Sequence, residues 1–259
     1  MRVVSANVNG LRSASKKGFL EWMVNSQVDV ACLQEIKVQT DQLSTDLHYP
    51  KGYHAYFLPA VKKGYSGVAI YTKLKPKHVQ YGLNWPLADV EGRYIQIDFE
   101  HLSIVSLYLP SGTSGDARQA IKYQFLDYFK IYLQKIEFKQ RPFILCGDWN
   151  IAHKSIDLSH WKANQKTSGF LPEERAWMDE ILSELGFVDA FRVLNQSSEQ
   201  YTWWSQRSKT AWDKNIGWRI DYQIITPNLK SSVSAVSVYK LERFSDHAPL
   251  VIDYELINF

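Results

Sequence analysis

The sequence contains few cysteines and no long apolar segment. Its 259 residues include only two cysteines, Cys32 and Cys146, and both lie within short apolar runs. Cysteine in an interior strand behaves as a small hydrophobic side chain, so we expect no disulfide framework and a protein suited to a reducing cytosol. No apolar run approaches the roughly 20 residues that a membrane-spanning helix needs, so no membrane partner is expected.

The chain also lacks segments that would divide it. It has no linker rich in proline, glycine and serine, no low-complexity tract and no repeat of short period, which predicts one domain over residues 1–259. The first predicted strand begins at residue 2, so we expect no signal or transit peptide. No glycine-rich phosphate loop follows that strand, which argues against a doubly wound nucleotide-binding fold.

Neither sign of charge dominates the composition. The formal net charge is +3 and the sequence pI about 8.6, which permits a polyanionic partner without requiring one. Nine tryptophans and fifteen tyrosines are suited to stacking, yet each could equally fill a core. Composition alone therefore assigns no function.

Patterns of apolar residues predict an alternation of strands and helices. The runs expected to form strands are 3–6, 28–33, 67–71, 93–99, 104–107, 143–148, 220–226, 233–238 and 249–256. Helical spacing predicts helices over 16–27 and 116–139, and a further helix that Pro172 opens and Gly186 ends. This mixture, with long irregular loops, indicates an α/β sandwich.

Polar side chains follow several of the predicted interior strands. Asp148 and Asn150 follow the run 143–147, and comparable exits carry Asn7, Asn9, Glu35, Tyr108 and Ser111. Residues i and i+2 of a strand share a face, so Asp148 and Asn150 would point to one place if the strand continues through them. A core strand has no structural need for such residues, which indicates an active site at one edge of a sheet.

A second polar group lies near the end of the chain. Asp221 is flanked by apolar residues, and if it is buried it needs a partner such as His247. An Asp–His pair holds an imidazole in one tautomer or keeps it protonated beside a phosphate. Oxygen donors and imidazole, without a thiolate set, suit Mg²⁺ or Mn²⁺. The candidate metal ligands are Asn7, Asn9, Glu35, Asp148, Asn150, Asp246 and His247.

These residues belong to motifs that occur in a known order. Segments 7–12, 33–37, 147–150 and 245–247 resemble the endonuclease/exonuclease/phosphatase superfamily. Segments 64–68, 108–112, 169–175 and 217–222 narrow the resemblance to the exonuclease III family of abasic-site endonucleases, and the match runs from residue 2 to about residue 256. The resemblance implies a four-layered, DNase I-like α/β sandwich of two packed sheets, mainly antiparallel or mixed, flanked by helices.

The same resemblance implies roles for individual residues. Glu35 would be the main metal ligand, with Asn7 and Asn9 in support and Asp246 as a metal-associated carboxylate. Asp148 would move a proton, in a direction that the sequence leaves open. The remaining catalytic residues implied are Asn150, which orients the nucleophile, His247, held by Asp221 against the phosphate, and Tyr108, which supports the phosphate.

Substrate-binding positions are also implied. Trp203, Trp218 and Ile220 match the walls of a pocket for a flipped-out baseless sugar, and the segment 205–217 would grip the substrate. Two positions depart from many relatives: Ser111 replaces an asparagine, and Asn9 replaces an aspartate seen in some of them. Contacts to the DNA backbone are implied for Arg12, Lys17 and Tyr65.

The sequence thus predicts a Mg²⁺-dependent DNA repair nuclease that acts in the cytoplasm, at the nucleoid. It would cut duplex DNA on the 5′ side of abasic sites as a monomer, with Mn²⁺ able to replace Mg²⁺. The resemblance also allows degradation of 3′ termini or removal of blocked 3′ ends. Alternatives are a nonspecific DNase, a phosphoinositide or sphingomyelin phosphodiesterase, and a noncatalytic DNA-binding module.

Overall fold

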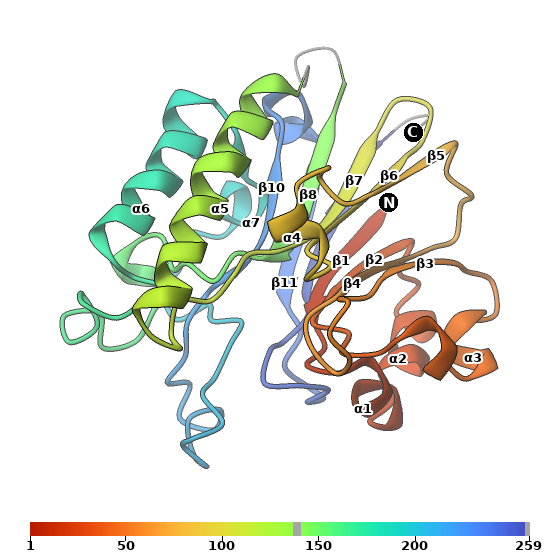
Figure 1. Ribbon diagram of the computed structural model, residues 1–259, viewed down its shortest axis with the longest axis horizontal. Coiled ribbons are helices and arrows are strands. Elements are labelled where there is room, and N and C mark those ends of the chain that lie inside the picture. Colours follow the sequence, from red (N-terminus) through yellow and green to blue (C-terminus); the bar gives the residue numbers. More distant parts are fainter. Residues whose placement is uncertain (137–140, 257–259) are drawn as a thin grey trace.

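Two six-stranded sheets form the centre of the structure, a computed structural model that describes residues 1–136 and 141–256 (Figure 1). The first sheet has the order β11 (Val233–Val238), β12 (Leu250–Tyr254), β1 (Arg2–Asn7), β2 (Val30–Gln34), β4 (Val68–Thr72), β3 (His54–Leu58). The second has the order β5 (His78–Tyr81), β6 (Tyr94–Asp98), β7 (Ser103–Tyr108), β8 (Phe143–Asp148), β10 (Asp221–Ile225), β9 (Val188–Asp189).

Each sheet contains one parallel pair of strands at its centre, and its other pairings are antiparallel. In the first sheet β1 runs parallel to β2, with Asn7 opposite Gln34 at their carboxyl ends. In the second sheet β7 runs parallel to β8, with Tyr108 opposite Asp148. The carboxyl ends of parallel strands meet at one edge, where open sheets usually place their sites. Both sheets therefore deliver polar residues to an edge in the same way.

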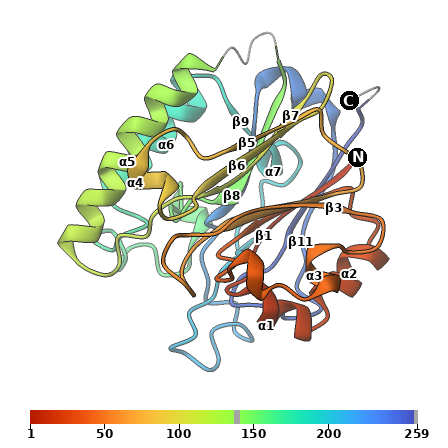
Figure 2. The ribbon, with the colours of Figure 1, turned by 45° about the vertical axis from the view of Figure 1, so that its right-hand side comes forward.

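Helices cover the outer face of each sheet and complete four layers (Figure 2). The first sheet is covered by α1 (Leu11–Lys16), α2 (Phe19–Asn25) and α3 (Thr45–His48), and the second by α4 (Pro86–Asp89), α5 (Asp116–Lys135) and α6 (Pro172–Asp179). A short helix, α7 (Ala190–Leu194), contributes Ala190 and Phe191 to the core between the sheets. These layers confirm the predicted four-layered sandwich of mixed sheets.

The core between the sheets explains why the central strands are apolar throughout. Val3, Cys32 and Ile70 of the first sheet share one buried cluster with Ile97 and Cys146 of the second. Both cysteines are buried as free thiols, which confirms their predicted structural place. Since the other faces of these strands pack under helices, nearly every residue of β2, β4 and β8 is buried.

Some predicted boundaries differ from those observed. The single helix predicted over 16–27 is wrong, because Gly18 adopts a left-handed conformation (φ 89°) that separates α1 from α2. Helix α5 ends at Lys135, and the predicted residues 137–139 lie outside the described residues. The helix from Pro172 continues beyond α6 as a π-helical turn, Glu180–Glu184.

Strands β3 and β5 were not predicted from the sequence; each is a short edge strand that is partly exposed. Among the described residues, no helix combines the length and apolar character needed to cross a membrane.

Candidate active site

Two carboxylates from different sheets meet at the edge where the parallel pairs end. Asn7, the last residue of β1, donates from Nδ2 to Glu35 Oε2 at 3.0 Å and to Asp148 Oδ2 at 2.9 Å. Glu35 follows β2, and Asp148 is the last residue of β8. One amide group therefore bridges the two sheets and sets the separation of their carboxylates.

An Asp–His pair lies beside Asp148. Asp221, the first residue of β10, is opposite Asp148 in the sheet register and contacts His247 Nδ1 through Oδ2 at 2.9 Å. His247 Nε2 lies 3.9 Å from Asp148 Oδ2, and all three side chains are buried. The imidazole is therefore held between two acids, and the pairing predicted for Asp221 and His247 is present.

Burial and neighbouring charge shift the pKa values of this group. Burial alone would lower the pKa of His247, but the charge and hydrogen bond of Asp221, with further attraction from Asp148, raise it to about 10. Burial, together with repulsion from Asp221, raises the pKa of Asp148 to about 7, although His247 and the Asn7 hydrogen bond oppose the shift. At neutral pH the imidazole is protonated, and Asp148 is poised to exchange a proton.

Several site residues have left-handed backbone conformations. The φ angles of Asn9, Glu35 and Asn150 are 42°, 56° and 51°. Such conformations cost free energy in residues other than glycine and persist where surrounding contacts fix them. At Asn150 the backbone N–H donates to Asp148 Oδ1 at 2.9 Å, and the side chain donates to the Leu109 carbonyl at 2.9 Å. Strand β8 ends at Asp148, as predicted, and the chain turns at Asn150, so the condition under which Asp148 and Asn150 would share one strand face is not met.

The loop that carries Asp246 and His247 is fastened to the first sheet. Ser245 donates from Oγ to the Asn7 carbonyl at 2.6 Å. Asp246 accepts from Asn9 Nδ2 at 2.8 Å and from Trp203 Nε1 at 3.2 Å. These contacts bring the carboxyl-terminal motif against the amino-terminal one.

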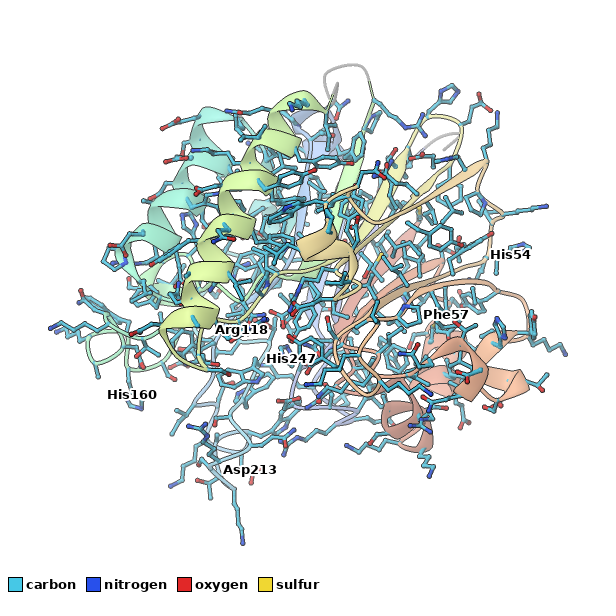
Figure 3. All side chains as sticks on the ribbon, in the orientation of Figure 1. His54, Phe57, Arg118, His160, Asp213 and His247 are labelled. Atoms are coloured by element: carbon cyan, nitrogen blue, oxygen red, sulfur yellow. The ribbon has the colours of Figure 1, made fainter. Side chains whose placement is uncertain are left out.

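A cavity of about 980 Å³ opens over these groups. Glu35, Asp148, Asn150 and His247 line its floor, and residues of the segment 164–171 line it together with three apolar residues, Trp203, Trp218 and Ile220. The two indole rings are 6.4 Å apart at an interplanar angle of 80°. Figure 3 shows His247 in the middle of the molecule and Asp213 at the far end of the loop 205–217.

Most residues predicted for the site lie at this cavity. The predicted residues that line it are Asn9, Glu35, Tyr108, Ser111, Asp148, Asn150, Trp203, Trp218, Ile220, Asp246 and His247. Asn7 and Asp221 lie beneath it and contact lining residues. Arg12 and Lys17 are exposed outside the cavity. Tyr65 is also outside, where its hydroxyl accepts from Arg118 at 2.9 Å.

Other residues at the site were not singled out from the sequence. Lys37 contacts Glu35 Oε1 at 2.8 Å and donates to Asn9 Oδ1 at 2.5 Å. The position of Lys37, two residues after Glu35, was the signal in the sequence that could have placed it at the site. Lys166 and Arg207 bring two further cations to the cavity; they lie in long loops, where no periodic pattern marks them.

The donor groups fit a divalent metal ion. Glu35 and Asp148 bring carboxylate oxygens to the same cavity, and the potential ligand atoms of Asp148, Asp221 and His247 all lie within 4.8 Å of one another. Because His247 is protonated and paired with Asp221, the carboxylates of Glu35 and Asp148 are the groups that fit the ion. The set is rich in oxygen and contains no thiolate, as hard cations prefer. Two mixed sheets under helices, with an acidic and imidazole site at one edge, define the class of DNase I-like metal-dependent phosphoesterases.

Comparison with known proteins places the chain within this class. The model of the Endonuclease/Exonuclease/phosphatase family matches residues 4–247. An exodeoxyribonuclease of Bacillus subtilis is 41% identical over 96% of this chain and 98% of its own. A DNA-(apurinic or apyrimidinic site) endonuclease of Dictyostelium discoideum is 36% identical over 99% of this chain and 71% of its own.

A solved structure gives the same result. The AP endonuclease from Archaeoglobus fulgidus superposes with a TM-score of 0.88 at 28% identity, covering 99% of this chain and 100% of that one. The chain belongs to the Endonuclease/Exonuclease/phosphatase family. The predicted resemblance to the exonuclease III family, and with it the interpretation as a hydrolase of the DNA repair nuclease type, is confirmed.

Proposed function

We propose that the protein hydrolyses the phosphodiester on the 5′ side of an abasic site in double-stranded DNA and leaves a 3′-hydroxyl. The observation that carries this proposal is a single cavity that joins Asp148 and His247 to the walls of Trp203 and Trp218. A sugar without a base is small enough for such walls, and it is extruded cheaply because no base pair is broken. The proposed selectivity requires that the base of a full nucleotide does not fit between these walls.

Residues on the cavity floor supply the chemistry at the phosphate. Protonated His247 donates to a phosphate oxygen, and Asp221 holds the ring. Asp148, with a pKa near 7, is suited either to take a proton from water or to give one to the leaving oxygen. Asn150 orients the nucleophile, and Tyr108 supports the phosphate from the cavity wall.

A divalent cation completes the proposed site. Glu35 would hold it with Asp148. Asn7, predicted as a ligand, donates from Nδ2 to both carboxylates and accepts from Asn9 N through Oδ1, so it would orient the two acids instead of binding the ion. Asn9 donates to Asp246, and Lys37 donates to Asn9 Oδ1. Because these contacts use their polar atoms, Asn9 and Asp246 would support the metal site without being its main ligands. Mg²⁺, replaceable by Mn²⁺, would supply Lewis-acid stabilisation of charge on the phosphoryl oxygens.

Contacts outside the cavity would hold the duplex. Arg12 and Lys17 are exposed on and beside α1, where they are free to contact DNA phosphates. Tyr65 would contact the backbone, and Ser111 is a short donor at the cavity edge. We propose that the protein acts as a monomer in the cytoplasm, where chromosomal DNA of the nucleoid is accessible.

Cleavage of a labelled duplex with one abasic analogue tests the proposal. We expect a single cut 5′ to the analogue, no cut in the matched intact duplex, and loss of cleavage in EDTA that Mg²⁺ or Mn²⁺ restores. Glu35→Gln and Asp148→Asn should each lower kcat by about 10² to 10⁴. A recessed-end duplex measures the 3′ exonuclease activity in the same assay.

The matched control is Glu180→Gln, an acid in an ion pair with Lys130 that is about one-third exposed on the outer helical layer. It should leave kcat unchanged. Equal turnover of intact and abasic duplexes, or near wild-type cleavage by Glu35→Gln, would contradict the proposal.

A further inference from the structure

One buried ion pair lies next to the active site without lining it. Lys122 on α5 and Glu174 on α6 have side chains that are fully buried, and Lys122 Nζ lies 2.5 Å from Glu174 Oε1. Burial lowers the pKa of Lys122, although Glu174 opposes that shift. Two charges taken out of water are costly even when they are paired, so such a pair is a weak means of stabilisation.

Joining α5 to α6 does not require this buried pair. Lys130 and Glu180 connect α5 to the turn after α6 at 2.6 Å, with both side chains about one-third exposed. Trp177 of α6 also donates from Nε1 to the Leu126 carbonyl of α5 at 2.9 Å. Lys122 and Glu174 also contact backbone groups at the cavity, and these contacts distinguish the buried pair from the exposed one.

Lys122 fixes the backbone of Asn150. Its ammonium group donates to the Asn150 carbonyl at 2.8 Å, immediately beside the cavity floor. Asn150 has a φ of 51°, a conformation that costs free energy and must be imposed by its contacts. With its N–H on Asp148 and its side-chain amide on Leu109, Asn150 is held at three points. The contact from Lys122 is a hydrogen bond from a charged, buried ammonium group, and such bonds are stronger than those between neutral groups.

Glu174 fixes the neighbouring backbone of residues 169–171, which also lines the cavity. Its Oε2 accepts the backbone N–H groups of Gly169 at 2.6 Å and Leu171 at 3.0 Å. Both residues line the cavity, and the Gly169 carbonyl in turn accepts from Ala152 N at 2.7 Å. A Cβ at Gly169 would lie 3.3 Å from the Trp218 ring, so this backbone also packs against the aromatic wall.

We propose that Lys122 and Glu174 are positioning residues of the nuclease site. The pair holds the backbone of Asn150 and that of residues 169–171 in fixed positions relative to each other, and neither residue touches the substrate. The inference rests on the proposed function, because it assumes that Asn150 acts at the scissile phosphate. A displacement of about 1 Å at a catalytic group is enough to cost up to about 100-fold in rate.

The test compares Lys122→Met with the double variant Lys122→Met/Glu174→Gln. Lys122→Met leaves Glu174 buried and unpaired and is expected to lower the melting temperature. The double variant removes both charges, while the amide oxygen introduced by Glu174→Gln still accepts from the backbone of residues 169–171, so we expect stability to recover towards wild type. The kcat of the double variant should stay about 10-fold to 100-fold below wild type, with KM changed less than about threefold.

The matched control is Lys130→Met, which removes the exposed pair on the same helices and should leave kcat and KM within about twofold of wild type. A stable double variant with wild-type kcat, or one altered in KM alone, would overturn the proposal. Loss of kcat in Lys130→Met to the same extent would overturn it as well, because the effect would then be general.

The assay separates this inference from the proposed function. The wild-type protein is first measured on abasic, intact and recessed-end duplexes. Failure to cut at the abasic site contradicts the proposed function and is visible before any variant is compared. The kcat comparison is then made on whichever duplex the wild type hydrolyses, so that a wild-type rate in the stable double variant still counts against the positioning role.

Discussion

Among single residues, Asp221 has the clearest effect on a neighbour. Its carboxylate is fully buried and holds His247 Nδ1 at 2.9 Å. Asp221→Asn removes the negative charge that keeps the imidazole protonated. It also replaces the carboxylate acceptor by an amide, which can turn either its oxygen or its NH2 group towards Nδ1. We expect kcat to fall by about 10² to 10⁴, measured on an abasic duplex at neutral pH. Asp253→Asn, in a partly exposed pair with Arg2, should leave kcat unchanged; equal losses in both variants would contradict the assigned role.

Asp157 provides a test of stability at the same scale. It is buried between Arg219 and Arg192, which contact Oδ1 at 2.8 Å and 2.6 Å. Burial would raise its pKa, but these arginines lower it to about 2. An unfolded aspartate titrates near 4. The lowered pKa of Asp157 between its two arginines therefore contributes about 2–3 kcal/mol to the unfolding free energy above about pH 4. That contribution is lost as the pH falls from about 4 to about 2.

Urea unfolding of wild type and Asp157→Asn between pH 2.5 and pH 6 measures this effect. Asp157→Asn should be less stable by about 3 kcal/mol at pH 6, and the difference should shrink as the pH falls. A difference that does not depend on pH would show that packing, and not charge, accounts for the loss. Glu180→Gln, from a pair that is about one-third exposed, should cost less than about 1 kcal/mol.

At the scale of elements, the spacing of β7 and β8 places Asp148. Gly147 lies opposite Leu107 in the parallel pair, and a Cβ there would come within 2.3 Å of the Leu107 carbonyl oxygen. Gly147→Ala should therefore push the strands apart. We expect the unfolding free energy to fall by about 1–3 kcal/mol and kcat by about 10-fold.

Gly52→Ala separates this clash from backbone strain. Gly52 has a φ of 83°, and a Cβ added there would meet nothing within 4 Å, so alanine at this position meets strain alone. It should cost about 1–2 kcal/mol and leave kcat unchanged. Urea denaturation and steady-state kinetics measure both variants; an unaltered kcat in a folded Gly147→Ala protein would contradict the role of the strand spacing.

For the whole molecule, the shared core between the sheets predicts one cooperative unit. Ile97 is fully buried in the cluster that joins both sheets. Ile97→Ala should lower the unfolding free energy by about 2–5 kcal/mol, and far-UV circular dichroism and tryptophan fluorescence should report the same transition. Leu241, which is 88% exposed, is the control, and Leu241→Ala should stay within about 0.5 kcal/mol. Two separate transitions would contradict a single domain.

Much of the fold was predictable, because strand burial leaves a clear pattern. The bounds of β8 and β11 were predicted within one residue. A continuous apolar run marks a strand that is buried on both faces, as in β8, and alternation of apolar and polar residues marks a strand with one exposed face, as in β11. The break between α1 and α2 was missed, because it depends on the left-handed conformation of Gly18 within an otherwise helical pattern. Edge strands β3 and β5 were not predicted; β5 is short and half polar, whereas the apolar residues 55–58 of β3 were an available signal.

The sequence by itself determined the chemical groups of the site, because Glu35, Asp148 and His247 stand in an ordered set of motifs. Only the tertiary structure decided their distances and protonation. A pKa of about 7 for Asp148 requires burial beside Asp221, which is 73 residues away in the chain. The tertiary structure also placed Lys122 against Asn150 and Lys37 against Glu35. Side-chain identity is local, whereas burial, charge proximity and cavity shape arise from elements that are distant in sequence and adjacent in space.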